Sequence, residues 1–190
     1  MGGLLPAWNS FHDPLHAVSR PAQLGPVWMH AQQTTGVPIN YNIWAKDPPA
    51  SSYPSCIAVK CAGLQSFHAA EQYLRMAREA VMKDGLNIAK RDVLIQVAWQ
   101  IATNGPGLLN VDQFIKDFDE GKGYEPFRQD LHDTQIQHIA RFPALIIRQH
   151  AKRTVMVTGY RTSAALIEII NGAAAQNSAA ATHTREQPLA

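Results

Sequence analysis

Apolar residues recur with helical spacing through the first three quarters of the chain. The first helix is expected to begin near Pro21 and end before Gly36, because proline suits a first helical turn and glycine follows a last one. Residues 39–54, rich in proline and serine, are expected to form an extended loop. The spacing of three to four residues predicts five further helices, over 53–64, 67–83, 90–103, 111–119 and 125–139.

The spacing of the apolar residues changes after residue 140. Residues 143–147 form a short branched apolar run, and residues 154–158 alternate like a strand. Two such runs across a short polar loop predict a β-hairpin. Thr162 is expected to cap a final helix whose exposed face holds Glu168 and whose inward face holds Ala165, Leu166, Ile169 and Ile170. Residues 173–190 show no lasting apolar period and predict a disordered tail.

Composition and charge exclude several classes of protein. The chain is 46% hydrophobic with a net charge of +2, which excludes a disordered chain and gives no general attraction to nucleic acid or anionic membranes. No segment approaches the roughly 18 consecutive apolar residues of a membrane helix. The N-terminus lacks the basic and apolar regions of a signal peptide. We therefore expect a cytoplasmic protein with no nucleic-acid partner and no membrane partner.

The two cysteines are the first candidates for chemistry. Cys56 and Cys61 fall on one predicted helix, where residues five apart point about 140° away from each other. They are therefore poorly placed to form a disulfide, and we expect small buried thiols. His12 and His16 are four residues apart, but Pro14 between them argues against a helix that would bring them together. We expect no metal site, no cofactor and no catalytic residue in this chain.

The order of these segments resembles that of a known family. The run from Arg141 to Ile147, the strand that leads to Tyr160, and the closing helix resemble the C-terminal half of a thioredoxin fold. The helical middle resembles the domain inserted into that fold in the DsbA family. The runs 47–54 and 91–95 are similar to its FrnE-like branch. The resemblance implies an α/β, thioredoxin-like fold of DsbA type with a large all-α insertion.

This resemblance implies a division of the chain into four parts. Residues 1–40 would hold the end of a strand from the N-terminal thioredoxin half, a loop and the following helix. Residues 41–139 would form the helical insertion domain, and residues 140–172 the C-terminal thioredoxin half. Residues 173–190 would be the disordered tail.

The resemblance also implies where the family's chemistry would lie. In the family, a Cys-x-x-Cys motif at the start of the first helix supplies a thiolate of lowered pKa. This sequence contains no such motif, and we expect an N-terminally truncated chain without the first strand and helix of the fold. Pro143 matches the proline that the family holds in cis beside its active site, and Phe142 would flank the substrate groove. Trp8 and His12 would border it, so these four residues are the expected substrate-binding residues.

Three functions remain open at this point. The leading hypothesis is a DsbA-like thiol-disulfide oxidoreductase or isomerase that is inactive as this chain, with protein or peptide thiols and disulfides as its partners. One alternative is a relative of the glutathione-dependent isomerases and kappa-class transferases, similar to 2-hydroxychromene-2-carboxylate isomerase, which would bind glutathione. The other alternative is a non-catalytic module that binds a peptide or a protein.

Overall fold

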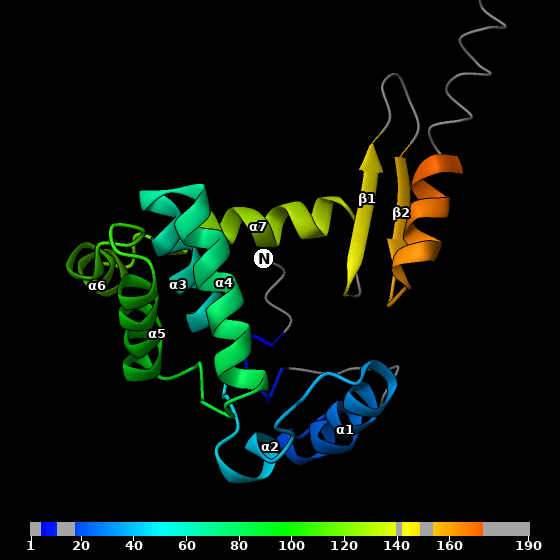
Figure 1. Cartoon of the computed structure of the whole chain (residues 1–190), viewed down its shortest axis with the longest axis horizontal. Helices are drawn as coiled ribbons and strands as arrows, with labels where there is room; N and C mark the ends of the chain where they lie inside the picture. The colour runs from blue at the N-terminus through cyan, green and yellow to red at the C-terminus, as the bar shows by residue number, and fades with distance from the viewer. Residues whose placement is uncertain (1–4, 11–17, 140–141, 149–153, 173–190) are drawn as a thin grey trace, which may run out of the picture. The chain divides into compact units, whose positions relative to one another are not determined.

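A computed structural model describes residues 5–10, 18–139, 142–148 and 154–172 of the chain (Figure 1). Contacts within the chain define two compact units, Met1–Asp133 and Thr134–Ala190. The finer division at residues 40, 139 and 172 stays a prediction.

The described part of the first unit is helical, as its apolar spacing predicts. Six of its helices fall within a few residues of the predicted ranges. These helices are α1 Leu24–Thr35, α3 Tyr53–Gln65, α4 Phe67–Met82, α5 Arg91–Asn104, α6 Val111–Asp119 and α7 Tyr124–Ile136. A short 3-10 turn, Pro21–Gln23, comes directly before α1. The extended loop expected over 39–54 is wrong in part, since α2, Ile43–Lys46, forms within it. This helical turn buries the side chains of Ile43 and Trp44. Removing their apolar surface from water stabilises the turn relative to an extended loop that would leave them exposed.

The main core of this unit lies between α3, α4, α5 and α6. Tyr73 is fully buried and stacks on Phe114, with ring centroids 5.0 Å apart. The Tyr73 hydroxyl donates a 2.6 Å hydrogen bond to the Leu94 carbonyl, so the polar end of this buried ring is satisfied. Helix α7 joins the same unit through Phe127, which is buried and packs edge-on against Tyr53.

A smaller apolar cluster holds the N-terminal segment of this unit. Trp44 meets Trp28 and Trp8 edge-to-face, with ring centroids 4.9 and 6.1 Å apart. The Trp8 indole N–H donates to the Pro49 carbonyl at 2.9 Å. The Leu5 carbonyl accepts a 2.8 Å hydrogen bond from the Ser52 N–H. The described N-terminal residues therefore lie along the proline- and serine-rich loop.

The described part of the second unit is a hairpin followed by a helix. Strands β1, Ala144–Arg148, and β2, Thr154–Thr158, pair antiparallel, with Leu145 opposite Val157. The predicted strands and the final helix, residues 163–172, are confirmed. The Thr162 hydroxyl accepts from the Ala165 N–H at 3.3 Å, as expected for a cap. The inward position predicted for Ile170 is wrong, because 46% of this residue is exposed.

Candidate functional site

The Phe142–Pro143 peptide bond is cis, as the resemblance implies. It lies directly before β1, and the Pro143 carbonyl accepts a 2.8 Å hydrogen bond from the Gly159 N–H at the end of β2. Gly159 has a φ of 78°, which favours glycine over residues that carry a Cβ. The start of β1 and the end of β2 are thereby joined at one end of the hairpin.

A hollow of about 130 Å³ lies at this end of the hairpin. Its lining includes Pro143, Leu145, Val157, Tyr160, Arg161 and Leu166. Residues opposite each other in an antiparallel pair share a face of the sheet, so Leu145 and Val157 present one face to the final helix, which contributes Leu166. Arg161 is the one charged residue of this lining, and its Nη1 donates to the Tyr160 carbonyl at 2.8 Å. We define these lining residues as the Pro143 hollow.

Two of the four predicted substrate-binding residues lie in this part of the chain. Pro143 is exposed and lines the hollow, and Phe142 beside it is half-buried. Trp8 belongs to the first unit, where its ring packs on Trp44. His12 lies outside the described residues. The substrate-binding role of all four residues stays a prediction.

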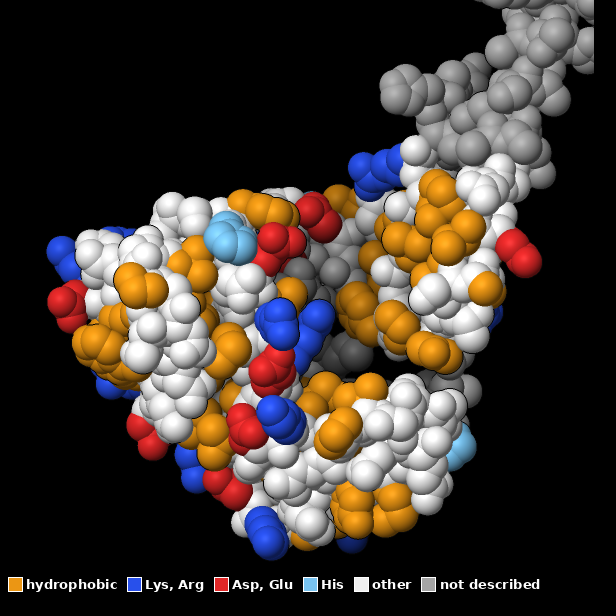
Figure 2. All heavy atoms as spheres, in the orientation of Figure 1, with side chains coloured by type: hydrophobic (Ala, Val, Ile, Leu, Met, Phe, Trp, Pro, Cys, Tyr) orange, Lys and Arg blue, Asp and Glu red, His pale blue; other side chains and the backbone are white. Residues whose placement is uncertain are grey.

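Several large apolar side chains of the hairpin and the final helix are exposed. Figure 2 shows hydrophobic side chains gathered on the surface of the hairpin and the final helix. Tyr160 is 65% exposed, and Ile167 and Ile170 lie on the side of the helix that faces solvent. Exposed apolar groups that gather in this way are typical of binding surfaces rather than of a closed core.

The two cysteines are buried thiols on α3, as predicted from their spacing. Burial raises the pKa of the Cys61 thiol to about 11. The backbone of α3 and the Cys61 sulfur also lie against Gly123, where a side chain of any size would collide with the Ile57 carbonyl and with the sulfur. Because the thiolate is the species that attacks disulfides, a thiol enclosed in this way is a packing residue.

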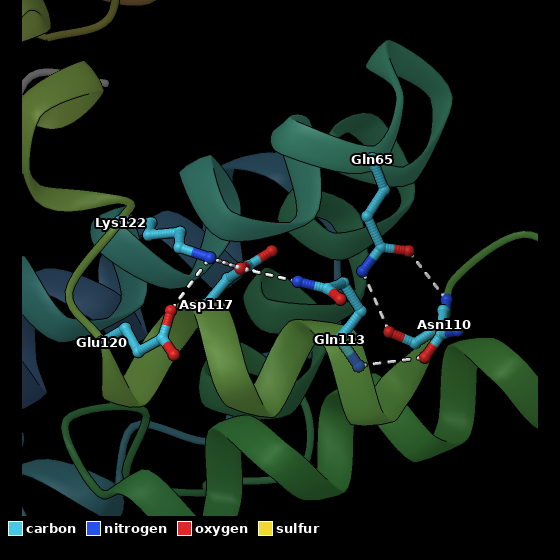
Figure 3. Close-up of polar contacts among 6 residues, drawn as sticks. All are labelled: Gln65, Asn110, Gln113, Asp117, Glu120 and Lys122. Carbon is cyan, nitrogen blue, oxygen red and sulfur yellow. Dashed lines mark hydrogen bonds and ion pairs between the residues drawn. The ribbon is translucent and has the colours of Figure 1, made fainter.

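Helix α6 holds a buried carboxylate that the sequence did not single out (Figure 3). The Asp117 carboxylate accepts from Lys122 Nζ and from Gln113 Nε2, each at 2.8 Å. The Lys122 hydrogen bond lowers the pKa of Asp117, and the same contact raises the pKa of Lys122. Both hydrogen bonds end on Asp117 Oδ1, and the one from Lys122 ties the end of α6 to the turn before α7.

The neighbouring part of Figure 3 shows how α6 begins. Asn110 caps the helix by accepting from the Gln113 N–H at 2.9 Å. Its backbone exchanges two hydrogen bonds with the side chain of Gln65, at 2.8 and 2.9 Å. These contacts satisfy polar groups that a helix start leaves open, so they explain the fold and supply no reactive group.

The first unit also contains a hollow, of about 270 Å³. It lies between α4 and α5, and its lining is Gln72, Met76, Ile101, Asn104, Gly105 and Leu108. It lacks any charged or nucleophilic side chain. Among the described residues, three or more His, Cys, Asp or Glu side chains nowhere gather as they would around a metal ion. Of the described helices, none is long and apolar enough to cross a membrane.

A family model described as "Thioredoxin" matches residues 4–167. The chain belongs to the DsbA-like thioredoxin family. The described residues of this family member are mostly helical and include a small two-stranded sheet.

Two curated relatives of this DsbA-like chain are named as adapter proteins. The ClpXP adapter protein SpxH of Halalkalibacterium halodurans is 28% identical over 146 residues, which cover 77% of this chain and 46% of that protein. The ClpXP adapter protein SpxH of Shouchella clausii is 27% identical over 77% of this chain and 45% of its own length. The chain therefore spans about half the length of the curated relatives it matches.

Solved structures show the same fold in the DsbA-like family. A candidate protein disulfide isomerase from Nitrosomonas europaea has a TM-score of 0.68 at 19% identity, covering 82% of this chain and 74% of that one. The cytosolic disulfide reductase DsbM of Pseudomonas aeruginosa, solved with GSH, has a TM-score of 0.53 at 22% identity, covering 68% and 62% of the two chains. At these identities the likeness concerns the fold alone.

Proposed function

We propose that this chain is a non-catalytic, protein-binding member of the DsbA-like family that acts as an adapter. The observation that carries the proposal is the position of both thiols inside the helical core of the first unit. The adapter name of the curated relatives supports it from the sequence side. We propose a cytoplasmic location, with neither nucleic acid nor a membrane as the partner.

The thiol chemistry of the family requires a thiolate that can reach a disulfide. Burial raises the pKa of the Cys61 thiol to about 11, so the thiol form dominates over the thiolate at neutral pH. Cys56 and Cys61 are both less than a tenth exposed, so a protein disulfide cannot approach either sulfur while α3 is folded. These two cysteines therefore do not substitute for a Cys-x-x-Cys motif.

The surface that we propose for a protein partner is the Pro143 hollow. It combines an apolar lining with an exposed aromatic side chain at Tyr160. Apolar surface supplies most of the free energy of protein association, and tyrosine is enriched at such contacts. Phe142 and Pro143 are proposed contact residues there. Trp8 and His12 stay proposed contacts from the N-terminal loop.

Glutathione fits the same hollow less well than a protein segment does. Glutathione carries two carboxylates, and the lining offers one cationic group, Arg161. The remaining lining is mainly apolar, and glutathione has no aliphatic or aromatic side chain that would fill it. We therefore place the glutathione-dependent isomerase or transferase relative behind the protein-binding module.

Two measurements on the full chain test this function. In an insulin reduction assay with dithiothreitol, we expect no turnover above the background rate, and turnover at an enzyme's rate would contradict a non-catalytic role. In biolayer interferometry we expect the full chain to bind immobilised ClpXP, and a lack of binding would contradict the adapter role. Saturable binding of glutathione by calorimetry, with no binding to ClpXP, would favour the glutathione alternative.

A thiol-free variant provides the matched control. Cys56→Ala with Cys61→Ala removes both sulfurs and keeps side chains that suit a helix. If the function is non-catalytic, this variant binds ClpXP with the affinity of the parent chain once tryptophan fluorescence shows that it is folded. A loss of binding in the folded variant would mean that the thiols take part.

A further inference from the structure

Charge is divided unevenly between the two units. Residues 1–133 contain 11 Lys and Arg side chains against 13 Asp and Glu, a net charge of −2. Residues 134–190 contain six against two, a net charge of +4. Between residues 134 and 172 the single carboxylate is Glu168, against five basic residues, Arg141, Arg148, Lys152, Arg153 and Arg161. The small overall charge of +2 therefore conceals a basic C-terminal unit.

The positive charge of this unit is not neutralised among the described residues. Seven ion pairs link described side chains, and all of them lie within residues 60–130 or join Lys90 to Asp47. Arg148 and Arg161 therefore form no ion pair within the described part of the chain. One N–H of Arg161 bonds to the neighbouring Tyr160 carbonyl, and the others remain for a ligand.

Arg161 also lines the Pro143 hollow, so an arginine with no ion pair among the described residues stands beside an apolar recess. A volume of about 130 Å³ is close to that of a cavity of about 150 Å³ that accepts a benzene molecule. The recess therefore has room for one aliphatic or aromatic side chain. A guanidinium can bind a carboxylate through two parallel hydrogen bonds, which fixes the position of an acidic residue next to that side chain.

We infer that the Pro143 hollow binds an acidic segment of a partner protein, with one apolar side chain in the recess and an adjacent Asp or Glu paired with Arg161. This inference rests on the proposed function and specifies the chemistry of its partner. Complementary charge would speed the encounter between the basic unit and an acidic segment. A polynucleotide offers negative charge but has no aliphatic side chain for the recess, so the described surface favours a peptide.

Three labelled peptides test the inference by fluorescence anisotropy with the full chain. Each has a central leucine flanked on both sides by two glutamates, two serines or two lysines, with glycines at the ends. We expect the glutamate peptide to bind about threefold to tenfold more tightly than the serine peptide and the lysine peptide to bind most weakly. The difference should shrink when the salt is raised from about 50 to 300 mM.

Two arginine variants locate the effect. Arg161→Gln should remove most of the preference for glutamate over serine. Arg128→Gln is the matched control, because Arg128 is an exposed arginine of the first unit paired with Glu125, and it should leave the preference unchanged. If both variants lost the preference for the glutamate peptide equally, the inference that Arg161 at the hollow binds the acidic residue would be overturned.

The remaining outcomes separate this inference from the proposed function. Equal binding of all three peptides, or tightest binding of the lysine peptide, overturns the acidic preference and leaves the adapter role untouched, since that role is measured on ClpXP. Binding of a labelled oligothymidine that depends on Arg161, with no peptide selectivity, also overturns it. If the peptides do not bind and ClpXP does not bind, the inference and the proposed function both fail.

Discussion

The helical unit encloses many of its large apolar side chains in one core, whereas the described part of the hairpin unit encloses almost none. Tyr73, Phe114 and Phe127 are fully buried in the first unit. In the described part of the second unit, Val157 is the one buried hydrophobic residue, while Met156, Tyr160 and Ile167 are 40%, 65% and 57% exposed. The two units have similar apolar sequences, so the difference lies in how many elements surround each side chain.

This contrast separates residues that stabilise the chain from residues that are available to a partner. Several helices close around one core in the first unit, and each side chain there contributes through burial. Two strands and one helix cannot cover both faces of a sheet. The second unit therefore retains apolar surface that a partner can cover. All four tryptophans lie within residues 1–133, so their fluorescence reports on the helical unit.

The largest expected effect is in the helical core. Phe114→Ala would leave a cavity between Tyr73 and Phe118, and we expect the free energy of unfolding to fall by about 3–5 kcal/mol. Urea titration followed by tryptophan fluorescence measures this change in the free energy of unfolding. Phe67→Ala is the control, because Phe67 is largely exposed and its loss should change stability by less than about 0.5 kcal/mol. Similar losses in the two variants would contradict the closed core described for this unit.

A smaller loss is expected where α3 meets the turn before α7. The Cβ added by Gly123→Ala would collide with the Ile57 carbonyl and lie 2.6 Å from the Cys61 sulfur, so we expect a loss of about 1–3 kcal/mol. Gly172→Ala should be neutral, since a Cβ there meets nothing within 4 Å. The same urea titration compares both. An unchanged stability for Gly123→Ala would mean that α3 and this turn are less closely packed.

The next effect depends on pH. The pKa of Asp117 is lowered in the folded chain, so its carboxylate stabilises the fold above its ordinary pKa of 3.8, and this contribution is lost as the pH falls below that value. Asp117→Asn should therefore reduce stability by about 1–2 kcal/mol at pH 7 and by less at pH 3. Asp112→Asn, at an exposed position of the same helix, should have little effect at either pH. A loss of equal size at both pH values would rule out the charge as its cause.

The smallest effect on stability is expected in the second unit. Ile167→Ser should change the melting temperature little, because the side chain is already exposed to water. It should also lower the fluorescence of bound anilinonaphthalene sulfonate, a dye that binds exposed apolar surface. Val157→Ser, at a buried position of the same unit, should instead increase hydrogen exchange in the hairpin. A marked loss of stability in Ile167→Ser would show that this face is already covered within the chain.

The elements were predictable because their periods are local. Helix α6 has the predicted bounds Val111–Asp119, since Asn110 caps it and its apolar residues repeat every three to four positions. Helix α2 was missed because a four-residue turn is too short to show a period. The position of Ile170 was wrong because apolar residues at 166, 167, 169 and 170 cover more of the helix than one neighbour can bury.

Of the candidate site, single residues could be predicted from the sequence, but their grouping into a hollow could not. Pro143 was identified from the resemblance, and its cis peptide is confirmed. The hollow beside it depends on Tyr160, Arg161 and Leu166, which no motif of the sequence marks as a group. The contact between Gly123 and Cys61 joins residues 62 positions apart, and no local pattern reports such a distance.

By itself, the sequence determined the longer helices, the hairpin and the absence of a Cys-x-x-Cys motif, because each of these depends on residue identity or on neighbours within a few positions. Only the tertiary structure decided which apolar residues are enclosed, why the Cys61 thiol stays protonated, and which arginine borders the Pro143 hollow. Burial and long-range contact depend on how many elements surround a side chain, and residues distant in the chain supply those elements.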